Sequence, residues 1–215
     1  QGEGISTGAP SVFVRLAGCN LLCKSENWVC DSIEVWKKGT KFNHADVLPD
    51  EYVSSLAQGA HLIFTGGEPM LQQRDIVEYF EWFQEKFKFL PFVEIETNGT
   101  VVPNIELQKL VNQWNVSPKL DSSGALLKFN MVALKVFSKL NTQFKFVIST
   151  KNDIEEILSV YMPLVRKSKV VLMPAGDSQE SLLKTRLYTI ELCKIHGFYY
   201  SDRLHIVVWN LKTGV

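Results

Sequence analysis

The stretch SVFVRLAGCNLLCKSENWVC, residues 11–30, joins a β-rich apolar run to a polar loop that carries three cysteines. We expect residues 11–17 to form a strand, because β-branched and aromatic residues are enriched there. Cys19, Cys23 and Cys30 follow within the loop. Three thiolates in one loop can bind a zinc ion together with one further ligand, or three irons of a cubane iron–sulfur cluster.

A fourth ligand separates these two kinds of site. Structural zinc sites normally have four protein ligands, often from two Cys-x-x-Cys pairs, and the sequence has no second pair. The remaining cysteine, Cys193, lies far along the chain in a helical segment, where we expect it to pack in the core. Three cysteines without a fourth favour a cluster with one open iron, at which a small molecule can coordinate. The zinc site stays an alternative.

The rest of the chain alternates short β-rich runs with longer segments of helical period, which is typical of an α/β domain with a largely parallel sheet. The further expected strands are residues 60–64, 92–96, 114–117, 144–149, 169–173 and 204–209. Helices are expected over residues 50–58, 69–88, 130–139 and 178–196, with Pro69 at a first helical position and Gly197 as a terminator.

Two further helices are expected from their capping residues. Asn104 can cap a helix whose apolar residues share one face, namely Leu107, Leu110, Val111 and Trp114. Asp153 can cap a second helix with the same spacing in Ile154, Ile157, Leu158 and Tyr161.

The composition describes a chain that can bury a sizeable core. The 215 residues are 46% hydrophobic and carry 23 basic and 23 acidic side chains, so the formal net charge is zero. A neutral chain argues against a polyanion-tracking surface, and we expect no nucleic-acid partner. No apolar run approaches the roughly 20 residues that span a bilayer, so we expect a cytoplasmic protein without a membrane partner. We expect one domain over residues 1–215, and residues upstream of Gln1 because natural chains begin with methionine.

The segment TGGEP, residues 65–69, lies between the expected strand HLIF and the helix that begins at Pro69. Adjacent glycines let a ligand approach the backbone closely, and the amides at a helix start face negative charge such as a carboxylate. A Gly-Gly turn often serves only to reverse the chain. Its place after the C-terminal end of a strand favours a ligand role, because α/β enzymes bind ligands there.

Taken in order, the motifs resemble those of the 7-carboxy-7-deazaguanine synthase family within the radical S-adenosylmethionine superfamily. The resemblance rests on QGEG at 1–4, FVRLAGCNLLC at 13–23, FTGGEP at 64–69, IETNGT at 95–100 and SPK at 117–119, with a looser likeness to RLHIVVWN at 203–210. The superfamily's usual spacing is Cys-x3-Cys-x2-Cys, whereas this loop is Cys-x3-Cys-x6-Cys. The cysteine count is kept, and the loop after Cys23 is enlarged.

The resemblance implies a partial, modified TIM-like barrel of about six mostly parallel strands, with fewer helices than a full barrel. It implies that Cys19, Cys23 and Cys30 hold a [4Fe-4S] cluster whose fourth iron takes S-adenosylmethionine. The implied cofactor contacts are Val29, Asp31, Gly66, Gly67, Ser117, Pro118, Lys119, Met173 and Pro174. Glu96 and Asn98 are candidates for indirect or cofactor contacts, and a turn role fits Asn98 equally well.

The family's substrate is 6-carboxy-5,6,7,8-tetrahydropterin, which would undergo a radical ring contraction with loss of ammonia. Arg15 can pair with the substrate carboxylate, Glu3 can accept hydrogen bonds from pterin N–H groups, and Thr65 can add a hydroxyl. Gln1 and Gly2 would contribute mainly backbone contacts.

The resemblance further implies Mg2+, a homodimer and an electron donor such as a flavodoxin. Ser32 stands where threonine is more usual, and its hydroxyl oxygen can still bind magnesium. Two alternatives remain open. One is a glycyl-radical-enzyme activase of the same superfamily, which acts on a protein, and the other is a zinc-binding module without catalysis.

Overall fold

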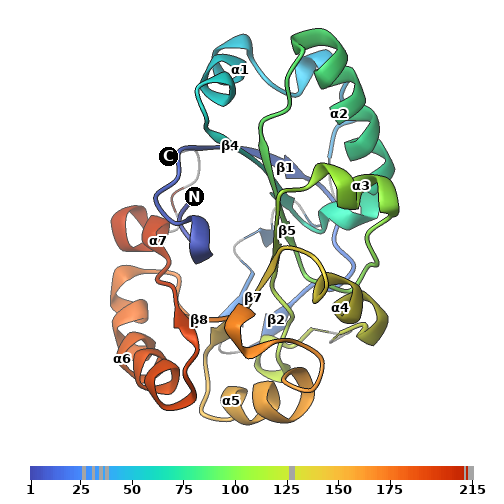
Figure 1. Ribbon diagram of the computed structural model, residues 1–215. Helices are drawn as coiled ribbons and strands as arrows, with labels where there is room; N and C mark the ends of the chain where they lie inside the picture. Colours follow the sequence, from blue (N-terminus) through green and yellow to red (C-terminus); the bar gives the residue numbers. More distant parts are fainter. Residues whose placement is uncertain are drawn as a thin grey trace.

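Seven strands form one sheet in the order β1-β4-β5-β6-β7-β8-β9, and every pairing within it is parallel. The computed structural model describes residues 1–25, 28–30, 32–33, 36, 39–125, 129–210 and 212. The strands are β1 (Ser11–Leu16), β4 (His61–Gly66), β5 (Phe92–Thr97), β6 (Gln113–Val116), β7 (Thr142–Ile148), β8 (Val170–Pro174) and β9 (Tyr199–Tyr200). The order ends at β1 and β9, so the described strands curve into a partial barrel (Figure 1). The predicted fold class is confirmed, with the two-residue β9 as a seventh strand.

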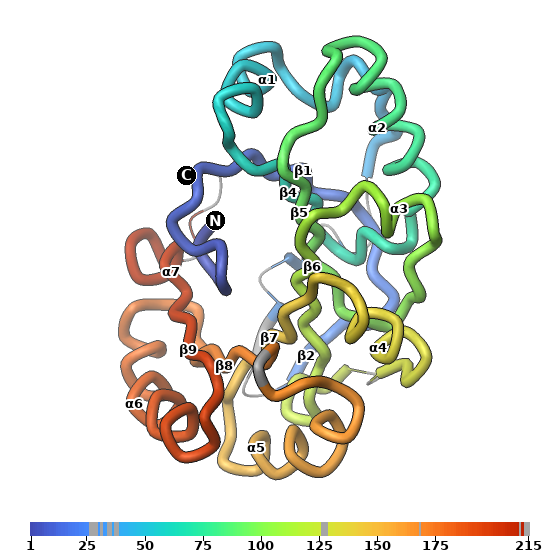
Figure 2. The backbone as a smooth tube through the Cα atoms, in the orientation of Figure 1, coloured from blue at the N-terminus to red at the C-terminus, as the bar shows by residue number. Residues whose placement is uncertain are grey.

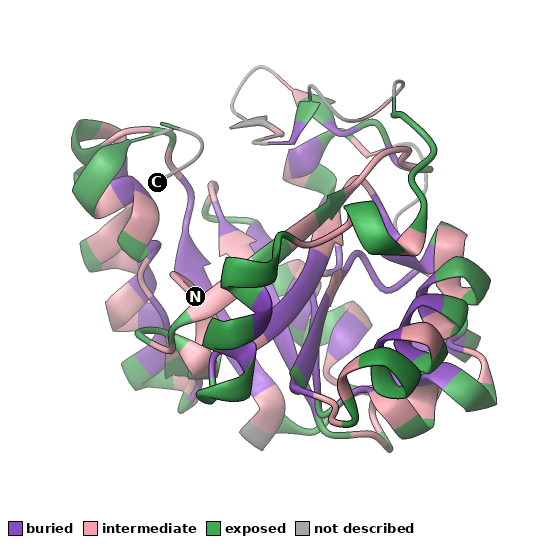
Figure 3. Ribbon diagram, turned by 90° about the horizontal axis from the view of Figure 1, so that it is seen from above, coloured by how far each residue is buried: buried purple, intermediate pink, exposed green. Residues whose placement is uncertain are grey.

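Helices connect the strands and surround the sheet, which Figure 3 shows as buried strands among helices with exposed outer faces. They are α1 (Asp50–Ala57), α2 (Gln73–Phe87), α3 (Ile105–Leu110), α4 (Met131–Phe137), α5 (Asp153–Glu156), α6 (Gln179–His196) and α7 (Leu204–Trp209). Short 3-10 helices are η1 (Gly4–Ser6), η3 (His44–Asp46), η4 (Pro69–Gln72), η5 (Asp121–Ser123) and η7 (Lys167–Lys169), and η6 (Ile157–Tyr161) is a π-helix. An antiparallel hairpin, β2 (Lys24–Ser25) and β3 (Trp28–Val29), lies in the cysteine loop. Among the described residues, none of the helices is long and apolar enough to cross a membrane.

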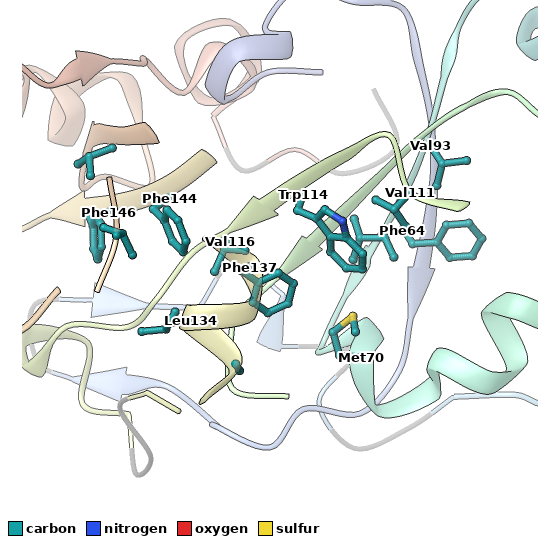
Figure 4. Packing of buried hydrophobic residues seen from close by; sticks show 14 of the residues in the cluster. Phe64, Met70, Val93, Val111, Trp114, Val116, Leu134, Phe137, Phe144 and Phe146 are labelled. Atoms are coloured by element: carbon teal, nitrogen blue, oxygen red, sulfur yellow. The ribbon is translucent and has the colours of Figure 1, made fainter. Parts of the chain in front are cut away.

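The two faces of the sheet differ in chemistry because successive strand residues point to opposite sides. The outer face is apolar and packs on the helices, as Figure 4 shows for Phe64, Val93, Trp114, Val116 and Phe144 of the strands with Met70, Leu134 and Phe137 of the connecting segments. The alternate residues of the central strands are polar: Glu94, Glu96, Asn115, Gln143 and Lys145. These polar side chains lie inside the partial barrel, and they bond to one another there.

Residues 204–209 form α7, so the strand predicted there is wrong. The sheet position beside β8 is taken by Tyr199–Tyr200, which follow directly once Gly197 ends α6. The 204–209 run instead packs beside α6, where the Gln179 side chain donates to the Val207 carbonyl at 2.6 Å. Of this run only Ile206 is fully buried. Its β-branched residues favour a strand intrinsically, but tertiary contacts make the run helical.

Two details of the predicted helices also differ. α3 is capped by Asn104 as expected, but it ends at Leu110, and Trp114 lies in β6 with 1% of its surface exposed. Asp153 does not cap α5, whose N-cap is Asn152. Its carboxylate accepts hydrogen bonds from the backbone N–H groups of Ser149 and Thr150, so it closes the turn that leaves β7.

Candidate active site

The TGGEP turn packs directly against the start of the cysteine loop. The Gly67 N–H donates to the Leu16 carbonyl at 2.9 Å, and the Glu68 N–H donates to the Gly18 carbonyl at 2.7 Å. A Cβ on Gly66 or Gly67 would come within 2.1 or 2.0 Å of these same carbonyl oxygens. Glycine is therefore required by the close approach of two backbone segments. The contact of Gly66 and Gly67 with a cofactor stays a prediction.

The Glu68 side chain links this turn to the end of β5 through hydrogen bonds. Its fully buried carboxylate accepts hydrogen bonds from the Met70 N–H at 3.0 Å, the Thr97 hydroxyl at 2.7 Å and the Asn98 N–H at 2.6 Å. Burial raises the pKa of Glu68, while the three hydrogen bonds and the charge of Lys119 oppose the rise. The TGGEP and IETNGT motifs are thus joined through one side chain.

Asn20, Asn98 and Thr100 form a set of hydrogen bonds that we call the asparagine clasp. The Asn98 side-chain amide donates to Oδ1 of Asn20 at 2.9 Å, and the Asn20 amide donates to the Thr100 hydroxyl at 2.8 Å. Oδ1 of Asn98 in turn accepts from the Thr100 N–H and hydroxyl. Because Asn20 follows Cys19, the clasp ties the cysteine loop to the end of β5. Asn98 is among the residues predicted from the sequence, and Asn20 is not.

The three loop cysteines interact electrostatically. Burial raises the pKa of the Cys23 thiol to about 11, and the charges of Cys30 and Cys19 add to the rise while Lys119 opposes it. Among the residues that the structure describes, no three His, Cys, Asp or Glu side chains are gathered closely enough to hold a metal ion. The donor set fits a cluster in its chemistry, because three cysteine thiols in one loop are the ligands that a cubane cluster needs and metal binding favours the thiolate.

The residues around the last loop cysteine are only partly described. Val29 belongs to β3, where its backbone pairs with Lys24. Asp31, predicted as a cofactor contact, lies outside the described residues. Ser32 is 8% exposed, and its hydroxyl oxygen accepts a hydrogen bond from Nη1 of Arg15 at 2.9 Å. The predicted magnesium ligand and the predicted carboxylate-binding arginine therefore touch.

Arg15 and Thr65 are register partners on the adjacent parallel strands β1 and β4. Parallel partners point to the same face of a sheet, so both side chains lie on the side opposite Leu16 and Phe64, which pack with the outer core. The structure thus places Arg15 and Thr65 near the C-terminal ends of neighbouring strands and brings Ser32, which follows β3, to Arg15.

Glu3 belongs to a second group, the inner charge network, which consists of Glu3, Glu96, Lys145 and Arg203. Lys145 is 1% exposed and lies 3.1 Å from one Glu3 oxygen and 2.7 Å from a Glu96 oxygen. Nε of Arg203 lies 2.9 Å from the other Glu3 oxygen. The Gln1 amide also donates to Glu96, at 2.9 Å. Only Glu3 and Glu96 of this network were singled out from the sequence.

The network holds its members in defined charge states. Burial would raise the pKa of Glu3, but the charges of Lys145 and Arg203 outweigh it and hold that pKa well below its usual range. Burial would lower the pKa of Lys145, but Glu96 and Glu3 raise it above its usual range. For Glu96, burial raises the pKa, Lys145 opposes the rise and Glu3 adds to it. Glu3 is therefore an anion and Lys145 a cation, and Glu96 is the carboxylate that protonates more readily.

A polar row continues the network deeper into the barrel. The Asn115 amide donates to Glu94 at 2.6 Å and to Glu96 at 3.1 Å, and the Gln143 amide donates to Oδ1 of Asn115 at 2.6 Å. Sequence reasoning missed Asn115, Gln143 and Lys145. The signal was present, since polar residues alternate with apolar ones in FVEIE and QFKFV, and such a pattern indicates a polar inner face.

The remaining predicted cofactor contacts lie at the ends of three adjacent strands. Ser117, Pro118 and Lys119 follow β6 and line a small cavity with Val147 of β7. Val147 is the register partner of Met173 on β8, and Pro174 pairs with the next β7 residue, Ile148. The SPK segment and the 173–174 segment therefore lie at one edge of the sheet, where the charge of Lys119 also reaches Cys23.

The chain is similar to known proteins along most of its length. Residues 1–122 match the family model described as a 4Fe-4S single cluster domain. The 7-carboxy-7-deazaguanine synthase of Pyrobaculum aerophilum is 32% identical over 217 aligned residues, which cover 100% of this chain and 92% of the relative. Those of Halobacterium salinarum and Rhodopirellula baltica are 31% and 33% identical, covering 98% and 100% of this chain and 87% and 84% of the relatives.

Two solved structures share the fold. QueE from Escherichia coli superposes with a TM-score of 0.64 at 23% identity, covering 95% of this chain and 90% of that one. The anSMEcpe structure with bound AdoMet gives a TM-score of 0.54 at 18% identity, covering 91% of this chain and 64% of that one. Neither the glycyl-radical activase nor the zinc module is favoured by these matches. With full-length relatives above 30% identity and an iron–sulfur domain over its N-terminal half, the chain belongs to the 7-carboxy-7-deazaguanine synthase family, as its motifs predicted.

Proposed function

We propose that this chain converts 6-carboxy-5,6,7,8-tetrahydropterin into 7-carboxy-7-deazaguanine with release of one ammonia. The atoms balance as a ring contraction with loss of ammonia, and the reaction needs no net oxidant or reductant. The observation that carries the proposal is the meeting of Arg15, Thr65 and Ser32 beside the cysteine loop of a chain from this family. A guanidinium and two hydroxyls are suited to binding the carboxylate of a small molecule.

The cysteine loop would hold the [4Fe-4S] cluster through Cys19, Cys23 and Cys30. Bound there, the cluster and S-adenosylmethionine supply the radical chemistry that removes a hydrogen atom from C6 of the pterin. The turns at Gly66–Gly67, 117–119 and 173–174 would hold the cofactor, together with Val29 and Asp31. The cavity beside the SPK segment, which follows the C-terminal end of β6, supports this placement.

The protein's own residues would orient the pterin. Arg15 would take the substrate carboxylate, and its hydrogen bond to Ser32 would then be exchanged for one to the substrate. Ser32 would contribute its hydroxyl oxygen to Mg2+, which prefers oxygen ligands. Thr65 would add a hydroxyl, and Glu3, held as an anion by Lys145 and Arg203, would accept from pterin N–H groups. Gln1 and Gly2 would contribute through the backbone of the same segment.

Residues 1–215 would act as one domain in the cytoplasm, where thiols stay reduced, and an electron donor such as a flavodoxin would reduce the cluster. A second copy of the chain would complete a homodimer. Exposed Leu183 and Leu187 on α6, at 63% and 69% of their surface, support such a contact.

Product analysis tests the activity. The holoenzyme, reconstituted anaerobically, would be incubated with S-adenosylmethionine, reductant, Mg2+ and carboxytetrahydropterin. We expect 7-carboxy-7-deazaguanine and ammonia in equal amounts, with iron and sulfide bound to the protein. An intact cluster that yields no deazaguanine would contradict the proposed reaction, and zinc without iron or sulfide would contradict the cluster itself.

A further inference from the structure

The N-terminal segment lies along the residues that follow β9, in the opening between the β1 edge and α7 (Figure 2). The Gly2 carbonyl accepts from the Leu204 N–H at 2.9 Å, and the Gly4 N–H donates to the Ser201 hydroxyl at 2.7 Å. These two backbone contacts flank Glu3. The position of the Glu3 carboxylate is therefore tied to the segment 201–204.

The Arg203 side chain contacts the carboxylate of Glu3, and it also contacts the backbone carbonyl of Gly176. Its guanidinium is buried, with Nε 2.9 Å from a Glu3 oxygen and Nη1 donating to the Gly176 carbonyl at 2.7 Å. Gly176 follows Met173 and Pro174, the residues proposed to line the cofactor. Because a guanidinium is a rigid planar fork, its two bonds fix the Glu3 carboxylate and the Gly176 carbonyl relative to each other.

The 175–176 turn is otherwise held from outside the pterin site. The Thr185 hydroxyl of α6 donates to the Ala175 carbonyl at 2.7 Å, and the Ala175 N–H donates to the Ile148 carbonyl at 2.9 Å. Neither bond involves Glu3. Arg203 thus connects an element of the proposed pterin site to an element of the proposed cofactor site.

We propose that Arg203 couples the two sites, so that pterin bound at Glu3 tightens the binding of S-adenosylmethionine at the 173–176 turn. This inference rests on the proposed function. A pterin that fixes Glu3 also fixes Arg203 and the Gly176 carbonyl, and the cofactor then meets a turn that is already ordered. By thermodynamic linkage, the cofactor must tighten pterin binding by the same factor.

Calorimetric titration of the reconstituted holoenzyme without reductant measures this coupling, because no turnover occurs. S-adenosylmethionine would be titrated with and without saturating carboxytetrahydropterin, and the ratio of the two Kd values is the coupling factor. For the unchanged chain we expect a factor of about 5 to 10, within the usual range for coupled sites. For Arg203→Lys, which keeps the positive charge but loses the fork, we expect a factor below about 2.

Two matched control variants distinguish a loss of coupling between the two sites from a general effect on the structure. Arg186→Lys alters an arginine of α6 that pairs with Asp202 at 3.0 Å, and it should leave the coupling factor unchanged. Thr185→Val loosens the turn without touching Glu3, so it should weaken cofactor binding equally with and without pterin. Should Arg203→Lys not fold with its cluster, Arg203→Gln replaces it in the same titration.

The outcomes distinguish this inference from the proposed function. A variant at Arg203 that keeps the full coupling factor overturns the inference, as does an unchanged chain that binds both ligands independently. In both cases product formation would still support the proposed function. A chain that binds no pterin at all would overturn both.

Discussion

The side-chain amide of Asn98 donates to Oδ1 of Asn20 at 2.9 Å, which links the end of β5 to the residue that follows Cys19. Asn98 is itself held through its backbone N–H by the buried carboxylate of Glu68. The path from the TGGEP turn through IETNGT to the cysteine loop is therefore continuous. Three motifs far apart in the sequence form one support for the loop that carries the cysteines.

Asn98→Ala removes the donor to Asn20 and the acceptor for Thr100. Because groups that support metal ligands commonly change metal affinity tenfold or more, we expect cluster retention to weaken by about tenfold. Iron and sulfide content after gel filtration, with the cluster absorbance, measures this. Asn104→Ala is the matched control: it removes the N-cap of α3, costs about 1 kcal/mol of stability and should leave the cluster intact. Equal cluster content in both variants would contradict the role of the clasp.

Three of the four cysteines should be required for the cluster, and the fourth should not. Alanine at Cys19, Cys23 or Cys30 should abolish the cluster absorbance, because each removes a ligand. Cys193 lies on α6, where its thiol donates to the Tyr199 carbonyl at 3.4 Å and is 6% exposed. Cys193→Ala should therefore retain the cluster with at most a small loss of stability. Loss of the cluster in Cys193→Ala would show that the assignment of three ligands is incomplete.

Arg15→Ala tests the proposed substrate contact. A charge-assisted hydrogen bond contributes about 1.5–3 kcal/mol, so pterin binding should weaken by about 10- to 100-fold. Cleavage of S-adenosylmethionine without substrate should persist, because Arg15 is not among the proposed cofactor contacts. Deoxyadenosine formation and pterin affinity are the two measurements. Arg74→Ala, at an exposed arginine of α2, should change neither. Unchanged pterin affinity in Arg15→Ala would show that Arg15 does not bind the substrate carboxylate.

Glu3 should contribute stability that depends on pH. Its pKa lies below the ordinary value of 4.5, so its ionised form stabilises the folded chain above that pH, and the contribution is lost as the pH falls. Glu3→Gln should cost about 3 kcal/mol near neutrality, because the buried side chains of Lys145 and Arg203 lose an anionic partner. The raised pKa of Glu96 acts in the opposite direction, and this rise is smaller in Glu3→Gln because the Glu3 charge contributes to it.

Urea unfolding at several pH values measures this effect. The difference in unfolding free energy between the unchanged chain and Glu3→Gln should shrink steadily below pH 4.5. A difference that does not vary with pH would mean that the Glu3 carboxylate is not held as an anion by Lys145 and Arg203.

Much of the fold could be predicted because its signals are local. Six strands follow from short β-rich runs, and caps such as Asn104 and terminators such as Gly197 have short-range signatures. The run at 204–209 could not be assigned in this way. Its residues favour a strand, and only the occupation of the sheet edge by Tyr199–Tyr200 makes it helical.

The site could be predicted only where its residues lie in compact motifs. The loop cysteines and the TGGEP turn are contiguous, and their chemistry is apparent from residue type. Two partners of Glu3, Lys145 and Arg203, lie about 140 and 200 residues away along the chain and share no spacing with it. The alternation of polar and apolar residues in QFKFV was the local sign of Lys145. Its contact with Glu3 and Glu96 depends on the curvature of the sheet.

Leu187→Glu tests the proposed homodimer. Leu183 and Leu187 form the exposed outer face of α6, and Glu180 and Lys194 stand seven residues to either side of Leu187. If two copies of α6 cross antiparallel about Leu187, each Glu180 meets Lys194 of the second copy, so the face is complementary to itself. A glutamate placed at the centre should give a monomer with its cluster and fold retained, as light scattering after gel filtration would show. Ile105→Glu, at an equally exposed position of α3, should stay dimeric. A monomeric unchanged chain would contradict the homodimer. A dimeric Leu187→Glu variant would show that the dimer contact does not involve Leu187.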